Sequence, residues 1–318
     1  EVMEIGDDLT VLRDGRVAGR GLVADFTADQ VVELIGGRSL ETTFPDKPAA
    51  PAATATPALE VLELSGPGYD NVSFSVYPGQ IIGLAGVEGN GQRRVLRGIA
   101  GGGATGGRVL VNGEEISTRS RRSASSAGVV FLPGDRIGEA MFGKMSIREN
   151  AVAGALRAAM PGGFVRRSRE YELTREGVAG LAVKTPHFEV PVSALSGGNQ
   201  QKVLLARGRL GDPKVLLVED PTQGVDAGAR VDIYAFLREL AASGVAVVVL
   251  STDAVELEGL CDRVVVFSRG RVQTTLIGDD VDERAITGAA VLSHATASVE
   301  VARDAGRLVD AEREFTYA

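Results

Sequence analysis

Short apolar runs alternate with helix-like windows along most of this chain. The runs are continuous and have the length of strands; they lie at Ile81–Ala85, Arg108–Val111, Val129–Leu132, Val215–Glu219, Val245–Leu250 and Val264–Phe267. Windows such as Asn199–Leu210 and Gly228–Ala242 have helical length, and in the second one Ile233, Leu237 and Leu240 form an apolar stripe. Buried strands separated by helices predict an α/β domain with a largely parallel sheet that is covered on both faces.

Two parts of the chain share one pattern at a constant separation of 255 positions. Residues 1–17 and 256–272 each contain a helix end, an aspartate, an apolar strand, a glycine turn and the start of another strand. Six positions are identical between them: Glu1, Asp7, Val11, Gly15, Arg16 and Val17. Because the match needs no gap and the separation has the size of a domain, residues 1–45 are expected to be the truncated tail of a first copy.

The rest of the chain divides into three further parts. Residues 46–57 are rich in Pro, Ala and Thr and are predicted to form an extended linker. A nearly complete domain is expected over residues 58–290. For residues 291–318 the pattern leaves two alternatives open, a weakly amphipathic helix and an exposed tail.

Composition removes several classes of function. The net charge of −8 argues against nucleic-acid binding, which draws on a basic face. The single cysteine, Cys261, excludes an internal disulfide, and with only two histidines it makes a zinc site improbable. No apolar run approaches the roughly 20 residues that span a bilayer. The sequence does not open with a charged, then apolar, then small-residue pattern, so no signal peptide is expected.

A glycine-rich segment follows the strand Ile81–Ala85. Its frame fits the phosphate loop G-x-x-x-x-G-K-[ST], in which backbone N–H groups surround phosphates at a helix N-terminus. The candidate nucleotide-binding residues are Gly86, Gly89, Asn90, Gly91, Gln92, Arg93 and Arg94. Two chemical positions depart from the pattern, because Gln92 replaces the phosphate-binding lysine and Arg93 replaces the Mg²⁺-binding hydroxyl. Arg93 or Arg94 is hypothesised to supply part of the missing charge; a bare glycine turn is the alternative.

A carboxylate pair ends the strand Val215–Glu219. Glu219 and Asp220 lie where a nucleotide-hydrolysing protein binds Mg²⁺ and activates water, so Glu219 is the candidate metal ligand and both are candidate catalytic groups. The usual order is Asp followed by Glu. Because Asp220 is shorter by one methylene, its carboxylate falls short by about 1 Å, which predicts a weak catalytic base.

The most specific stretch runs from Leu195 to Lys202. Ser196 can cap a helix, and the following glycines allow close backbone approach, but capping does not require the two glutamines. The sequence LSGGNQQ resembles the signature of ATP-binding cassette (ABC) proteins in the form typical of carbohydrate importers. Residues 221–230 resemble the D-loop segment of these proteins, and the short motifs at 64–68, 133–136 and 184–186 resemble the second cassette of ribose-type importers.

The resemblance covers about residues 58–287 and implies a P-loop NTPase fold of the ABC type. It implies a parallel core sheet, an antiparallel subdomain and a helical subdomain, with ATP and Mg²⁺ as ligands. In such proteins two cassettes pack head to tail, and each nucleotide lies between the phosphate loop of one and the signature of the other. By resemblance, the signature residues that act on the partner's nucleotide are Ser196, Gly197, Gly198, Asn199 and Gln200, together with Asp226 of the D-loop.

The departures from the family pattern all lie at positions that act on the cassette's own nucleotide. The Q-loop glutamine is replaced near Leu132, and Thr252 stands at the position of the switch histidine. These losses affect the cassette's own nucleotide, whereas the signature and Asp226 are intact. The resemblance therefore implies that the cassette's own site is weak or silent in hydrolysis and that its signature acts in trans. On this basis the chain alone is expected to hydrolyse ATP negligibly.

The implied protein is the second half of the ATP-binding subunit of a monosaccharide importer such as a ribose importer. Its expected partners are membrane permease subunits, the first cassette and, indirectly, a substrate-binding protein, at the cytoplasmic face of the membrane. The loop from Pro133 to Met145 is expected to contact the permease. A nucleoside importer, a catalytically silent docking module and a non-transport ABC protein of DNA repair or translation are the alternatives; the short, neutral linker disfavours the last.

Overall fold

The computed structural model describes residues 2–13, 16–27, 30, 31, 34, 44–48 and 56–291. Two units emerge from the contacts: one comprises residues 1–46, 135–210 and 222–239, and the other comprises residues 47–134, 211–221 and 240–318. Most of the predicted linker, the predicted tail beyond 291, and Glu1 and Gly15 of the repeated pattern lie outside the described residues.

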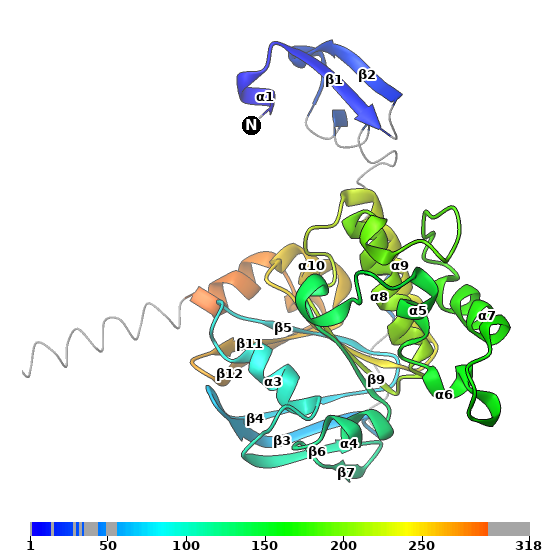
Figure 1. Ribbon diagram of the computed structural model, residues 1–318. Coiled ribbons are helices and arrows are strands. Elements are labelled where there is room, and N and C mark those ends of the chain that lie inside the picture. The colour runs from blue at the N-terminus through cyan, green and yellow to red at the C-terminus, as the bar shows by residue number, and fades with distance from the viewer. Residues whose placement is uncertain are drawn as a thin grey trace, which may run out of the picture. The chain divides into compact units, whose positions relative to one another are not determined.

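A six-stranded sheet forms the centre of the second unit (Figure 1), with the strand order β12-β11-β5-β10-β9-β8. The strands are β5 Ile81–Ala85, β8 Val129–Leu132, β9 Val215–Glu219, β10 Ala246–Leu250, β11 Arg263–Ser268 and β12 Arg271–Ile277. All neighbours pair in parallel except β11 and β12, which are antiparallel. Every residue of β5, β9 and β10 is buried, which explains their continuous apolar sequences. The predicted parallel α/β sheet is confirmed.

A second, antiparallel sheet has the order β4-β3-β6-β7. Its strands are β3 Leu59–Gly66, β4 Tyr69–Val76, β6 Gly106–Val111 and β7 Glu114–Ile116. Helix α3 (Gln92–Ile99) lies between the two sheets and contacts β3, β4 and β10 (Figure 1). Its side chains Val95, Leu96 and Ile99 are fully buried in the core that both sheets share. This packing fixes the first turn of α3, which continues the glycine-rich segment.

Short elements complete the second unit. Helix α4 (Arg121–Ser126) packs against β8, and α10 (Ala254–Leu260) packs against β5. The 3-10 turn η6 (Gly278–Asp280) follows β12. Among the described residues, no helix combines the length and the apolar character needed to cross a membrane.

Helices dominate the first unit. Helices α5 (Ile147–Val152), α7 (Arg167–Val178) and α8 (Gly197–Leu210) pack on one another around Ile147, Ala151, Val192 and Val203. The other elements are α6 Leu156–Ala159, most of α9 Ala227–Ala242, and the turns η3 Arg136–Ala140, η4 Pro161–Gly163 and η5 Val192–Ala194. The two helical windows predicted from the sequence correspond to α8 and α9.

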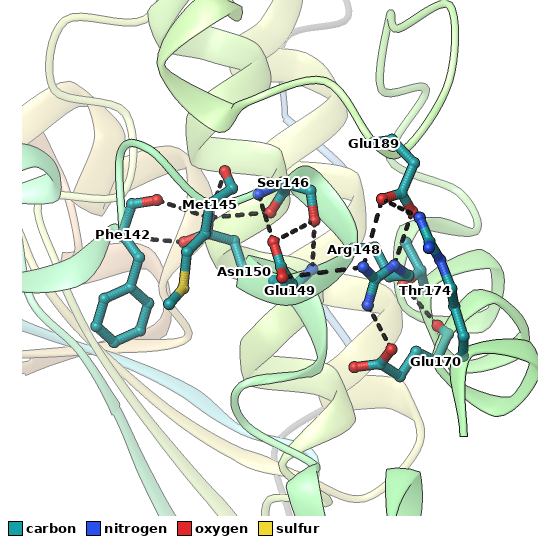
Figure 2. A network of polar contacts seen from close by, with 10 residues as sticks. Phe142, Met145, Ser146, Arg148, Glu149, Asn150, Glu170, Thr174 and Glu189 are labelled. Carbon is teal, nitrogen blue, oxygen red and sulfur yellow. Dashed lines mark hydrogen bonds and ion pairs between the residues drawn. The ribbon is translucent and has the colours of Figure 1, made fainter. Parts of the chain in front are cut away.

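A buried ion network holds this helical region together (Figure 2). Arg148 of α5 is 6% exposed, and its guanidinium donates to Glu189 at 2.8 Å and to Glu170 of α7. Arg167 also donates to Glu189, at 2.7 Å. The hydrogen bond from Arg148 is the main cause that lowers the pKa of Glu189 to about 2. The network connects α5 and α7 to the segment that precedes the signature.

The N-terminal elements repeat those at the end of the central sheet. Strands β1 (Asp8–Arg13) and β2 (Arg16–Leu22) and turn η1 (Val23–Asp25) precede β11, β12 and η6 by 255 positions at both bounds. Helix α1 (Val2–Ile5) ends 255 positions before the end of α10. The antiparallel pairing shifts register after Val11 in β1, and the β11–β12 pair shifts after Val266, again at this separation. The repeat found in the sequence is therefore also a structural repeat. Its interpretation as the tail of a first cassette stays a prediction.

Candidate nucleotide-binding and signature sites

The phosphate loop connects β5 to α3 through three glycines with positive φ. Gly86, Gly89 and Gly91 have φ angles of 152°, 90° and 95°, values that side chains rarely adopt. A Cβ on Gly91 would lie 2.6 Å from the carbonyl oxygen of Gly68, whereas one on Gly89 would meet nothing within 4 Å. The loop is therefore fixed by packing on one side and open at Gly89.

Gln92 occupies the inside of this loop. The residue is 5% exposed, and its Nε2 donates to the carbonyl oxygens of Gly86 at 3.0 Å and Val87 at 3.1 Å. Its Oε1 has no hydrogen-bond partner within the described part of the chain. The carboxamide thus bonds to the loop backbone but carries no charge that could attract a phosphate.

Two other predicted nucleotide-binding side chains contact the protein itself. Asn90 donates from Nδ2 to Phe267 O at 3.4 Å and accepts at Oδ1 from Arg269 N at 3.3 Å, so it joins the loop to the β11–β12 turn. Arg94 is exposed and donates to the carbonyl oxygen of Pro67 at 3.1 Å. Nucleotide binding by either side chain stays a prediction.

Two arginines of α3 contact the carboxylate pair at the end of β9. Glu219 has no solvent exposure, and Asp220 is 6% exposed. Arg93 donates from Nη2 to Asp220 Oδ2 at 2.9 Å and from Nη1 to Glu219 Oε2 at 3.3 Å. Arg97 donates from Nε to Glu219 Oε1 at 2.9 Å and from Nη2 to Glu219 Oε2 at 3.1 Å. The charge that Arg93 was hypothesised to offer to phosphates is therefore paired with carboxylates.

Backbone N–H groups supply further donors to the same carboxylates. Gly134 N donates to Glu219 Oε2 at 3.1 Å, and Thr252 N donates to Asp220 Oδ1 at 3.3 Å. Burial is the main cause that raises the pKa of Asp220, and Arg93 opposes this effect. Each of the four carboxylate oxygens thus accepts at least one hydrogen bond. Mg²⁺ requires open oxygen ligands in octahedral geometry, so this arrangement does not fit the ion predicted at Glu219.

Arg97 was not among the residues predicted for this site, although its spacing carried a signal. Arg97 follows Arg93 by four residues on α3, and side chains separated by four positions lie on the same face of a helix. Both guanidiniums therefore point to the strand end. Gly134 was also missed, because its contribution is a backbone N–H that has no mark in the sequence.

The signature begins helix α8 and presents an exposed serine. Ser196 Oγ accepts from Asn199 Nδ2 at 2.9 Å, and Asn199 Oδ1 accepts from Lys184 N at 2.8 Å. Gln200 donates from Nε2 to the carbonyl oxygen of Leu195 at 3.1 Å. The amide side chains thus hold the loop around Ser196, which explains their presence better than helix capping does.

The glycines of the signature allow the D-loop segment to approach closely. A Cβ on Gly197 would lie 3.1 Å from Gly224 O, and one on Gly198 would lie 2.9 Å from Ala229 Cβ and 3.1 Å from Asp226 Oδ2. Asp226 is exposed, and its Oδ1 accepts from Ala229 N at 3.0 Å at the start of α9. The structure therefore brings the predicted signature and D-loop residues together.

Arg136 adds a positive charge to this signature region. Its Nη1 donates to Gly197 O at 3.2 Å and lies 3.5 Å from Gln201 Oε1. Burial lowers the pKa of the Arg136 guanidinium. The sequence placed this residue in a family-like motif without assigning it a contact.

Comparisons with known proteins show what this chain is similar to. A family model described as ABC transporter matches residues 69–223. Ribose import ATP-binding protein RbsA 1 of Mesorhizobium japonicum is 38% identical over 304 residues, which cover 92% of this chain and 58% of that protein. The fold is that of an ABC-type nucleotide-binding cassette. The resemblance found in the sequence is thus confirmed at the level of the fold and of kinship with ABC transporter ATP-binding proteins.

Further matches to this ABC-type cassette are similar. RbsA 2 of Rhizobium meliloti is 38% identical over 287 residues, covering 90% of this chain and 56% of that protein. A nucleotide-free cassette from an ABC transporter superposes with a TM-score of 0.60 at 20% identity, covering 73% of this chain and 95% of the other. A dimeric bacterial ABC transporter cassette superposes with a TM-score of 0.59 at 19% sequence identity. The match covers 68% of this chain and 97% of the other. The chain thus spans little more than half the length of the curated relatives that it matches.

Proposed function

We propose that this chain is the second half of the ATP-binding subunit of an ABC importer for a monosaccharide such as ribose. A first cassette in the same longer protein would hold ATP and Mg²⁺ in its phosphate loop. The signature of the present cassette would complete that site in trans. The contrast between an accessible signature and an arginine-filled carboxylate site is the observation that carries the proposal.

The signature supplies what a γ-phosphate in a neighbouring site needs. Ser196 is exposed and its hydroxyl is fixed by Asn199 at the start of α8. The first N–H groups of a helix have no acceptor within the helix, which suits this end to an anion. Fixed donors of this kind stabilise charge that develops in a transition state, because they need no reorganisation. The proposed catalytic contribution of this chain is therefore charge stabilisation and positioning.

The chain's own carboxylates have a different part in this scheme. Glu219 and Asp220 are paired with Arg93 and Arg97, so they are unsuited to binding a metal ion or activating water. We therefore expect hydrolysis to occur at the other composite site. Closure of the two cassettes on ATP would then drive the permease between its inward- and outward-facing states.

The loop that follows Gly134 offers an apolar surface for the permease. Ile137, Phe142 and Met145 are 85%, 54% and 48% exposed. These exposed apolar side chains are close together in the sequence, and a group of this kind favours a contact with another protein. Under this proposal the cassette is a peripheral subunit at the cytoplasmic face of the membrane, bound to permease subunits and only indirectly to a substrate-binding protein.

The test compares two substitutions in the tandem protein reconstituted with its permease in liposomes. Ser196→Arg places a bulky cation at the trans site and should reduce both ATP hydrolysis and transport at least about a hundredfold. Asp220→Asn should leave both within about twofold of the unsubstituted protein. Ser168→Arg, at an exposed position of α7, is the matched control for the added arginine.

The outcomes separate the alternatives. Full ATP hydrolysis in the Ser196→Arg protein would indicate a silent docking module and overturn the trans role. Loss of hydrolysis with Asp220→Asn instead would move the active site to this chain's own carboxylates. Uptake of labelled ribose against labelled nucleosides in the same liposomes tests the substrate, for which the named ribose-import relatives favour the sugar.

A further inference from the structure

We propose that Arg93 and Arg97 together take the place of a divalent cation, so that this phosphate loop binds its nucleoside polyphosphate without metal. The inference deepens the proposed function and rests on it for the nature of the ligand. It concerns the cassette's own site, which the proposed trans activity leaves without an assigned chemistry.

The charges of the site balance without a metal ion. Glu219 and Asp220 carry two negative charges, and Arg93 and Arg97 carry two positive charges at contacts of 2.9 to 3.3 Å. A divalent ion supplies the same two positive charges in a site that has only the carboxylates. The guanidiniums therefore neutralise the negative charge of the two carboxylates that would otherwise attract Mg²⁺.

Displacement of the arginines by Mg²⁺ would be costly. Glu219 is fully buried and receives donors from Arg93, Arg97 and Gly134 N. If Mg²⁺ displaced the arginines from the buried carboxylate, their positive charges would lose their partner, and an uncompensated charge at a buried site is costly. Mg²⁺ is also reluctant to lose its hydration shell, and it demands near-ideal octahedral geometry. The buried carboxylate therefore favours the arginines over the ion.

The loop nevertheless retains features that bind an anion. Its three positive-φ glycines keep the backbone in the conformation of a phosphate loop, and Gly89 faces open space. Gln92 Nε2 donates to the carbonyl oxygens of Gly86 and Val87 and thereby supports this loop conformation. The Arg93 side chain is 42% exposed, so part of it remains accessible to a phosphate chain.

The arrangement also predicts that restoring the usual lysine and hydroxyl residues at positions 92 and 93 is not enough to create a Mg²⁺ site at Glu219. Gln92→Lys with Arg93→Ser reinstates the loop chemistry, but Arg97 still holds both oxygens of Glu219. Only the further change Arg97→Ala opens Glu219 to a metal ion. Arg122→Ala is the matched control, because Arg122 is an exposed arginine of α4 that lies outside the phosphate loop and the carboxylate pair.

The experiment measures binding of a ribose-labelled fluorescent ATP to the chain in Mg²⁺ and in EDTA. For the unsubstituted chain we expect dissociation constants within about twofold of each other. The triple variant with Arg97→Ala should bind at least about tenfold more tightly in Mg²⁺ than in EDTA, and the triple variant with Arg122→Ala should not, by analogy with the differential binding that a metal site confers. Electron paramagnetic resonance with Mn²⁺ reports the opened metal site directly.

Several results would overturn the proposal. These are tenfold tighter binding in Mg²⁺ by the unsubstituted chain, no nucleotide binding in either condition, or equal gains in both triple variants. The ratio for the unsubstituted chain decides the matter even if the Arg97 variant does not fold. All three results leave the Ser196 test of the trans role untouched, so failure of this inference and failure of the proposed function are distinguishable.

Discussion

Around Ser196, polar side chains support a hydroxyl that stays exposed, whereas around the phosphate loop they satisfy one another. Asn199 orients the serine and leaves its outer face open. Arg93 and Arg97 instead neutralise Glu219, which has no exposure at all. The same chain thus combines an exposed polar group with a pair of carboxylates whose charges are paired internally. The difference shows that polar side chains can either hold a group open to solvent or neutralise one another, depending on what packs around them.

The largest expected effect comes from closing the space between the signature and the D-loop. Gly198→Ala places a Cβ at 2.9 Å from Ala229 Cβ and should displace the signature by a fraction of an ångström to an ångström. Misplacement on this scale should lower ATP hydrolysis by the reconstituted tandem protein about a hundredfold. Gly288→Ala, where a Cβ would meet nothing within 4 Å, is the control. Equal activity of the two variants would show that the exact position of the signature does not matter for ATP hydrolysis.

On the phosphate-loop side, the arginines should matter for stability. Arg97→Leu removes the two-point contact to the buried Glu219 and should lower the free energy of unfolding in urea by about 3 kcal/mol. Arg94→Leu, which removes an exposed arginine of the same helix, should change it by less than about 0.5 kcal/mol. If both variants unfold at the same urea concentration as the unsubstituted chain, the pairing at Glu219 has no structural importance.

The contact between Arg148 and Glu189 should make the stability of the helical region depend on pH. The pKa of Glu189 is lowered from 4.5 to about 2, chiefly by Arg148, so its contribution to stability is present above the unfolded value of 4.5. It is lost as the pH falls through about 2. Melting temperatures recorded by circular dichroism between about pH 6 and pH 2.5 should fall less steeply in Arg148→Leu than in the unsubstituted chain.

An exposed ion pair provides the control for this measurement. Arg169→Leu removes a contact to Glu172 on the surface of α7 and should leave the slope with pH unchanged. The same steepness in all three proteins would show that the network in Figure 2 does not couple protonation to folding.

The smallest effect is expected from restoring the switch histidine alone. Thr252→His adds an imidazole near Asp220, but it leaves both carboxylates paired with arginine. ATP hydrolysis by the chain alone should be negligible before the change and should rise less than about twofold after it. A coupled-enzyme assay for released phosphate measures this, and turnover at ordinary ABC rates by either protein would refute the silent site.

Much of the fold followed from local patterns. Continuous apolar runs predicted β5, β8 and β9 at the observed bounds. In β5 and β9 every residue is buried, and strands that are buried on both faces are mostly apolar. The antiparallel strands β3 and β4 were not predicted as strands, since their burial is interrupted and their pairing with β6 joins distant segments. Local patterns do not encode such partners.

The sequence by itself determined which residue types stand at each motif. It showed Gln92 and Arg93 in place of the usual lysine and hydroxyl, the reversed Glu219-Asp220 pair and the complete signature. Only the tertiary structure decided what these groups contact. Helix α3 is held between two sheets, and this packing brings Arg93 and Arg97 to the end of β9, more than a hundred residues away in the chain. Ion pairing depends on distance and burial, which arise from packing rather than from the order of residues.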